Sequence, residues 1–283
     1  MKPVKSHTYP IHCFRFILLL SFLVSVCTAQ TNKTYNLKYN FRNGDTHQYK
    51  IQQFDSTQYN IQGKIDFGTI FRHKLQTLSI TKHPRQNSFS VAVKLDSNTI
   101  ENSLSYDQDN ELRFYLDYDP EVQENALSID EKGKPLDKNM YYIPTLIPLP
   151  GHSIALNQTW QFTFQYPVQE TEFFKGNTMG TGHCLFYDVQ ETPSDTIAIF
   201  IVEIESETEG KIKLIRPNNT IEYNYLKNQS STNFIYFDAT KGRILKVVAS
   251  MKFETALKNK NRYSKQSSIS KLFITLIENQ QTF

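Results

Sequence analysis

The chain has 283 residues, with 31 lysines and arginines against 28 acidic residues. Three of the basic residues, Lys2, Lys5 and Arg15, fall in the first 29 positions, where there is no acidic residue, so the rest of the chain carries 28 charges of each sign. A neutral chain without a basic stripe excludes nucleic acid as the main expected partner.

The first 29 residues have the pattern of a secretory signal peptide. Basic positions precede the apolar run FILLLSFLVSV, and small residues then indicate cleavage after Ala29. Val26 stands where a lipidation signal has Gly, Ala or Ser, so we expect no lipid anchor at Cys27. The mature chain is predicted to be exported, to the periplasm or outside the cell. No later run is apolar enough for a membrane helix, and we expect no transmembrane segment in the mature chain.

Period-two alternation of apolar and polar residues predicts an all-β, antiparallel fold. The first such segment, Tyr35 to Phe41, leads into a turn at Asn43 and Gly44. Further strands are predicted where the same alternation returns, at residues 89–95, 112–118, 160–166 and 245–253. One short helix is expected from Pro120 to Ala126.

Prolines interrupt the pattern in the middle of the chain. Pro144, Pro148 and Pro150 lack the donor that a sheet ladder needs, so we interpret this stretch as a seam. It separates an N-terminal β half, residues 30–145, from a C-terminal β half, residues 146–283. Similar turns around Gly133 and Gly242 make an internal duplication one interpretation. The expected architecture is two similar curved sheets or half-barrels, or one long folded sheet.

Three stretches of the chain carry a resemblance: the opening Y-x-L-x-Y-x-F-x-x-G from Tyr35 to Gly44, the P-L-P at residues 148–150 ahead of Trp160, and the glycine pair in MGTGHCLFYDV. With these stretches the chain resembles exported bacterial β-proteins of unknown function, often found in Bacteroidetes. The resemblance touches most of the mature chain. The shared motifs are structural, and the resemblance implies no catalytic residues.

Nucleophile, nucleotide and metal motifs are missing from the sequence, so we predict no catalytic residue, no metal site and no cofactor. The GTG at residues 180–182 is interpreted as a turn or bulge. His183 and Cys184 are neighbours, and on a strand they point to opposite faces and cannot act as a pair. Only Cys184 remains after processing, so folding is expected to need no disulfide.

Four glutamates at alternate positions have two possible interpretations, one structural and one catalytic. Glu203, Glu205, Glu207 and Glu209 fall on one strand face at about 6.6 Å spacing. They would form either an exposed face paired with lysines such as Lys211, Lys213 or Lys252, or part of a carboxylate-dependent hydrolase.

Four aromatic side chains are the weak candidates for a ligand site: Trp160, Phe162, Phe164 and Tyr166. On a flat sandwich they would be core, and on a curved sheet they would line an apolar pocket for a lipid or another apolar ligand. The leading hypothesis is therefore an exported, non-enzymatic β-protein that binds an apolar ligand or an envelope partner. The alternatives are the hydrolase and a structural surface or adhesion module.

Overall fold

The computed structural model describes most of the chain after residue 32. The described residues are 33–83, 87–103, 111–117, 124–136, 142–168, 171, 173–216, 219–260 and 262–277. The chain divides into two compact units, Met1–Thr34 and Tyr35–Phe283. The predicted signal peptide, with Cys13 and Cys27, lies outside the described residues. The second unit carries the fold.

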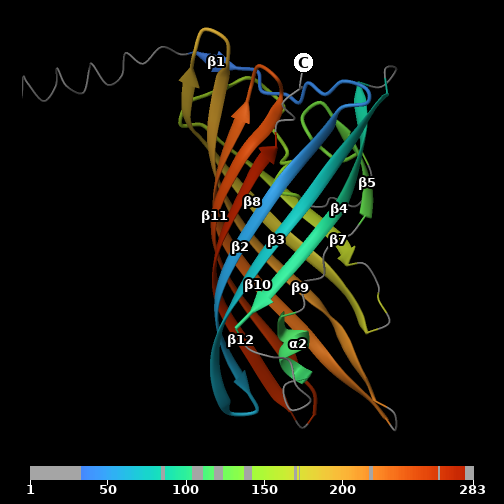
Figure 1. Cartoon of the computed structure of the whole chain (residues 1–283). Helices are drawn as coiled ribbons and strands as arrows, with labels where there is room; N and C mark the ends of the chain where they lie inside the picture. The colour runs from blue at the N-terminus through green and yellow to red at the C-terminus, as the bar shows by residue number, and fades with distance from the viewer. Residues whose placement is uncertain are drawn as a thin grey trace, which may run out of the picture. The chain divides into compact units, whose positions relative to one another are not determined.

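One antiparallel sheet of ten strands makes up the second unit (Figure 1). In sheet order the strands are β5 (Glu124–Asp130), β4 (Ser88–Asn102), β3 (Lys64–His83), β2 (Thr46–Ile61), β12 (Tyr263–Ile277), β11 (Arg243–Lys258), β10 (Asn219–Asp238), β9 (Thr196–Arg216), β8 (Phe174–Glu191) and β7 (Thr159–Val168). A two-stranded sheet contains β1 (Thr34–Tyr35) and β6 (Ile154–Ala155). The all-β, antiparallel prediction is confirmed.

Strands from both predicted halves belong to this one sheet. The N-terminal strands β2 to β5 and the C-terminal strands β7 to β12 meet where β2 pairs with β12, for example at Ile51 and Ile274. The described residues therefore do not form one sheet for each half, and the expected alternative of one long sheet is the one observed. The boundary between residues 145 and 146, and the internal duplication, stay predictions.

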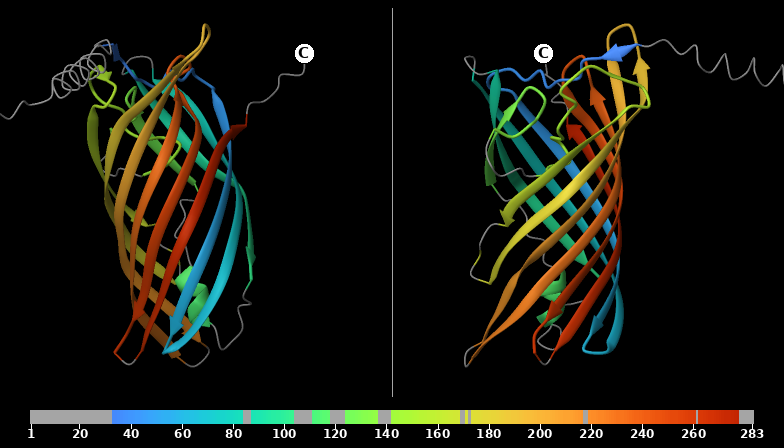
Figure 2. Two further views of the ribbon diagram at one scale, coloured as in Figure 1. Left: turned by 90° about the vertical axis from the view of Figure 1, so that its left-hand side faces the viewer. Right: turned by 180° about the vertical axis from the view of Figure 1, so that it is seen from behind.

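The ten-stranded sheet curls, so that it has a concave and a convex face (Figure 2). Period-two alternation sends apolar residues to the concave face: on β9, Val202 and Ile204 are buried, whereas Glu203 and Glu205 are exposed. Two core clusters fill the concave face. The large core cluster includes Tyr39, Tyr49, Ile147, Phe200 and Phe237, and the small core cluster includes Tyr59, Leu116, Phe174 and Tyr223.

The opening segment, residues 36–42, is not a strand, which corrects the prediction for Tyr35 to Phe41. Leu37, Tyr39 and Phe41 are buried as the alternation predicted. The backbone, however, bonds to two turns instead of a neighbouring strand: the Tyr39 N–H donates to the Glu131 carbonyl at 2.8 Å and the Asn40 N–H to the Gly242 carbonyl at 3.3 Å. The alternation identified the buried face but not the hydrogen-bonding partner.

Both predicted glycine turns press against this segment. Gly133 and Gly242 have φ of +73° and +64°, a region that favours glycine. A Cβ on Gly242 would lie 2.2 Å from the Asn40 nitrogen, and one on Gly133 would lie 2.7 Å from the Tyr39 ring. The glycines are therefore needed both for the turn conformation and for close packing.

The one helix among the described residues is α2 (Glu111–Asp117). This overturns the strand predicted at residues 112–118, and also the helix predicted from Pro120 to Ala126, because residues 124–126 belong to β5 and 120–123 lie outside the described residues. Leu112 and Leu116, one helical turn apart, both pack into the small core cluster. Leu112, Phe114 and Leu116 fit a period of two, whereas Leu112 and Leu116 also fit a period of four, so the pattern was ambiguous.

The proline stretch lies outside the sheet ladder, as predicted. Leu146, Ile147 and Leu149 are buried in the large core cluster. Tyr39 donates its hydroxyl proton to the Ile147 carbonyl at 2.9 Å, and Trp160 Nε1 donates to the Pro148 carbonyl at 2.9 Å. Two carbonyls of this irregular backbone are thus satisfied by aromatic side chains.

Candidate functional site

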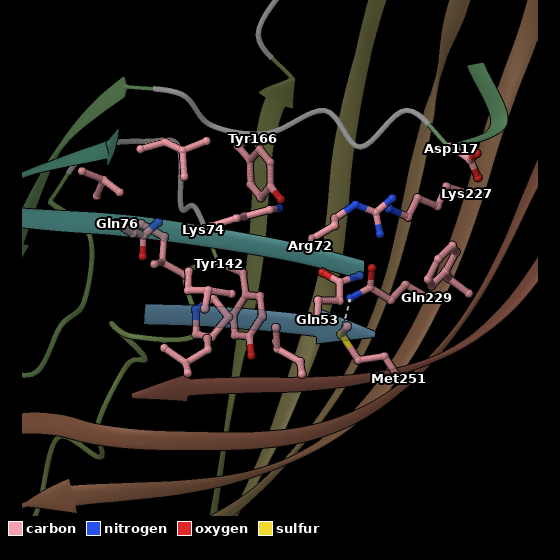
Figure 3. A pocket seen from close by; sticks show the side chains of 18 of the residues that line it. Gln53, Arg72, Lys74, Gln76, Asp117, Tyr142, Tyr166, Lys227, Gln229 and Met251 are labelled. Carbon is pink, nitrogen blue, oxygen red and sulfur yellow. Dashed lines mark hydrogen bonds between the residues drawn. The ribbon is translucent and has the colours of Figure 1, made fainter. Parts of the chain in front are cut away.

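A cavity of about 250 Å³ opens on the concave face between the two core clusters (Figure 3). Its lining comes from β2, β3, β4, β10, β11 and β12, with Leu116 and Asp117 of α2, Tyr166 of β7 and residues 142–144. Leu272 and Ile274 belong to the large core cluster, and Leu116 belongs to the small one. The cavity therefore marks where the packing of the two cores is incomplete.

One wall of the cavity is apolar. It consists of aliphatic and methionine side chains from β2, β4, β11 and β12: Ile51, Val93, Leu95, Met251, Leu272 and Ile274. Ile51 and Ile274 are directly opposite each other in the β2–β12 ladder, so these two side chains adjoin.

Three cations line the same cavity. Arg72 and Lys74 alternate on the inward face of β3, and Lys227 enters from β10. Arg72 is 5% exposed, and its Nη1 donates to Oδ2 of Asp55, which is fully buried. Asp55 Oδ1 also accepts from Gln53 Nε2 at 2.9 Å. This buried pair holds the guanidinium at the cavity wall.

Tyr142 stands between the cavity and the aromatic face of β7. Its ring stacks on Phe164 at 5.3 Å and on Phe162 at 6.2 Å between centroids. Its hydroxyl oxygen is buried and has no hydrogen-bond partner among the described residues, and burial raises the pKa of this phenol above its ordinary value. Tyr142 thus brings a neutral hydroxyl to a mainly apolar boundary.

The four predicted site residues share one face of β7, and they are divided between core and cavity. Phe162 and Phe164 are buried at 9% and 4% exposure, and Trp160 packs edge-on against Phe200 at 5.4 Å. Tyr166 alone of the four lines the cavity. No observation tests whether any of them binds a ligand, so that role stays a prediction.

Polar side chains fix α2 at one end of the cavity. Asp117 Oδ1 accepts from the Tyr59 hydroxyl at 2.7 Å and from Gln266 Nε2 at 2.8 Å. Arg113 Nη2 donates to Asp66 Oδ2 at 3.0 Å, and its guanidinium lies 5.2 Å from the Tyr59 ring centroid. The helix is therefore anchored to the sheet by charged groups as well as by Leu112 and Leu116.

The sequence analysis missed the cations of the cavity. A signal was present in the stretch Ile70 to Leu78, where Arg72, Lys74 and Gln76 continue the inward period set by Ile70 and Leu78. The outward set of this stretch also contains apolar residues, among them Phe71 and Leu75. Either face could have been buried, so the pattern alone did not assign the register.

The glutamate ladder lies on the convex face. Glu205 and Glu207 border an open depression there, together with Lys252. Within the described part of the chain no ion pair joins the four glutamates to a lysine, and Lys211 instead bonds Glu222 at 2.6 Å. The predicted pairing with Lys211 is thus wrong.

His183 and Cys184 lie on opposite faces of β8, as predicted. His183 is exposed, whereas Cys184 is 2% exposed and burial raises the pKa of its thiol. The GTG stretch is not a turn or a bulge, because Gly180 and Gly182 pair regularly within β8. Among the described residues no three His, Cys, Asp or Glu side chains are grouped as metal ligands would be.

No protein-family model and no curated protein sequence matches the chain, so the resemblance to exported bacterial β-proteins stays a prediction. Several solved structures do match. The outer membrane protein OpdK of Pseudomonas aeruginosa is 8% identical, over 82% of this chain and 99% of its own, with a TM-score of 0.22. An outer membrane channel of Pseudomonas putida F1 is 8% identical, over 84% of this chain and 97% of its own, with a TM-score of 0.22. Ail, the attachment invasion locus protein of Yersinia pestis, is 5% identical, over 82% of this chain and 99% of its own, with a TM-score of 0.16. Scores this low carry no argument about function.

These matches correct one expectation. A mature chain without a transmembrane segment was expected because no later run suits a membrane helix, and the helix described here is indeed too short and too polar to span one. The matched structures, however, are of an outer membrane protein and an outer membrane channel. Strands as well as helices can cross a membrane, which that reasoning did not consider. The expectation is therefore wrong, because it treated helices as the only spanning elements.

Proposed function

We propose that the protein is an exported, non-enzymatic β-protein of the cell envelope that binds an apolar ligand within its curled sheet. The observation that carries this proposal is the cavity of about 250 Å³, with its wall of aliphatic side chains and a small number of polar groups. Small-molecule sites generally have this form, a concave apolar surface with a few polar groups that orient the ligand.

The size of the cavity limits the ligand. Pockets that enclose drug-sized molecules measure roughly 300–1,000 Å³, and this cavity lies just below that range. A single acyl chain or a small aromatic compound fits such a volume better than a lipid with two chains. Periplasmic or extracellular location, as the sequence predicts, would give the protein access to such compounds.

An uncharged fluorescent probe, N-phenyl-1-naphthylamine, gives a direct test. Trp160 packs on Phe200 and does not line the cavity, so its emission is a poorer reporter of binding. We expect the purified protein to bind the probe saturably. Val93→Phe, which fills the cavity, should weaken binding about tenfold or more, since it removes the volume that the probe occupies.

Val248→Phe is the matched control, because Val248 lies on the convex side of β11 and is absent from the cavity lining. It should leave the affinity unchanged. Circular dichroism checks that both variants fold, and Leu95→Phe replaces Val93→Phe if the latter does not. Equal affinity for all variants would show that the probe binds elsewhere, and the proposal would then fail in favour of a structural or adhesion module.

A further inference from the structure

We propose that the ligand is a single-chain amphiphile whose anionic head group binds between Arg72 and Lys227. This inference rests on the function proposed above and names the chemistry of the same cavity. Arg72 comes from β3 and Lys227 from β10, four strand steps away in the sheet, and the curl of the sheet turns both toward one cavity. Figure 3 shows the two side chains extending toward each other.

The charge of the cavity favours an anion. Among the described lining residues, Arg72, Lys74 and Lys227 are cations and Asp117 is a carboxylate, with Asp55 behind Arg72. An anionic group of a ligand would be attracted to these cations, and partial burial strengthens that electrostatic attraction.

Each of the two cations is held in position from behind. Asp55 accepts from one nitrogen of Arg72, and a planar guanidinium held on one side keeps its remaining N–H groups in a fixed fork. Lys227 Nζ lies 5.0 Å from the centroid of the Phe253 ring, a cation–π distance. Such preorganised donors suit a carboxylate or a phosphate.

A glutamine amide adds a donor at the same end of the cavity. Gln229 Nε2 donates to the Met251 sulfur at 3.9 Å, and a thioether is a weak acceptor. An anionic oxygen would be a stronger partner for this amide. Beyond the polar end, Ile51, Leu272 and Ile274 offer the apolar surface along which a chain would lie.

Displacement of N-phenyl-1-naphthylamine by ten-carbon competitors separates the head group from the chain. Decanoate and decyl phosphate carry anionic heads, and decanol has the same chain without charge. We expect both anions to displace the probe at concentrations about tenfold or more below that needed for decanol, because charge-assisted hydrogen bonds are the stronger class. The two anions together show whether the site prefers a carboxylate or a phosphate.

Lys227→Met tests the assigned position. It should reduce the advantage of decanoate over decanol about tenfold, a ratio measured within the same variant, since the methionine removes the charge and keeps the apolar stem. Lys50→Met is the control, because Lys50 is exposed on the convex side of β2. Inorganic phosphate alone should not displace the probe.

The outcomes distinguish this inference from the function on which it rests. Probe binding in the cavity with equal displacement by decanoate and decanol would overturn the anionic head group and leave the proposed function intact. An unchanged decanoate advantage in Lys227→Met would overturn the assignment to Lys227 and Arg72. If the probe does not bind the cavity at all, both proposals fail.

Discussion

Replacing Gly182 with alanine should drive a methyl group into the ring of Phe162. The two residues are paired directly between β8 and β7, and a Cβ built on Gly182 would lie 2.3 Å from Cζ of the ring. Carbon atoms attract best at roughly 3.5–4.0 Å, so the ring would have to move by more than about 1 Å. All three of the nearest atoms belong to the Phe162 side chain, so the closest clash is with this ring.

The cost of this change follows from how tightly the ring is held. Phe162 is 9% exposed and lies near Tyr142 and Phe164, at 6.2 and 6.3 Å between centroids. Overpacking of such a site costs about 1–3 kcal/mol. For a unit of this size, each kcal/mol lowers the melting temperature by roughly 2–4 °C.

Urea unfolding followed by circular dichroism and Trp160 emission measures the loss. Gly151→Ala is the control, because a Cβ at Gly151 would meet only the flexible end of Lys134, at 3.3 Å, and should change stability by less than about 0.5 kcal/mol. If Gly182→Ala is no less stable than Gly151→Ala, the Phe162 ring does not cover Gly182 and the reasoning is refuted.

A double-mutant cycle identifies the partner. Phe162→Ala alone should cost about 3–5 kcal/mol. In the Phe162→Ala background, Gly182→Ala should cost nothing measurable, because the ring that it would strike is gone, and the coupling should equal the single-mutant cost of Gly182→Ala. Additive costs would place the clash with some other group.

Three further predictions concern buried polar groups. Asp55→Asn should lower the free energy of unfolding by about 3–5 kcal/mol, because it leaves the Arg72 charge buried without its carboxylate. The double variant Asp55→Leu with Arg72→Met should lower this free energy by less. Equal decreases for the two variants in urea unfolding would contradict this reasoning. Burial, with the Arg243 charge, lowers the pKa of His47 in the folded state, so the unfolded state binds the proton and stability should fall as pH drops below about 6.5. His47→Gln should flatten that pH dependence, and an unchanged slope would count against it. The Cys184 thiol should react with a disulfide reagent only after unfolding, and reaction in the native state would contradict its burial.

The sequence predicted the fold best where one strand face was apolar throughout. β4, β7 and β11 were found at residues 89–95, 160–166 and 245–253, because each alternates without interruption. The glycines at 133 and 242 were also interpreted correctly, since a turn needs positive φ. The alternation did not predict which segment each of these segments would hydrogen-bond to. Residues 36–42 are buried in the predicted pattern and yet bond to turns.

The role of the glycine pair of β8 cannot be predicted from the sequence of that strand alone. Gly180 and Gly182 looked like a turn or a bulge because a glycine weakens a strand on its own. In the paired register, Phe164 faces Gly180 and Phe162 faces Gly182, so each ring lies over a position without a side chain. The informative pattern is an F-x-F on one strand against a G-x-G on the next, and it becomes visible only when both strands are considered together.

The candidate site was missed for a related reason, and that reason bears on its function. Polar residues on the inward face of β3 interrupt the apolar pattern between Ile70 and Leu78. From the sequence alone, this interruption suggests that the other face of the strand points inward. A sheet built only for stability would continue the apolar face, because each inward charge needs a partner such as the Asp55 that holds Arg72. Here the interruption coincides with the cavity, and Lys227 joins it from a strand remote in sequence. These inward cations next to an apolar wall are the feature on which the proposed site for an anionic amphiphile rests.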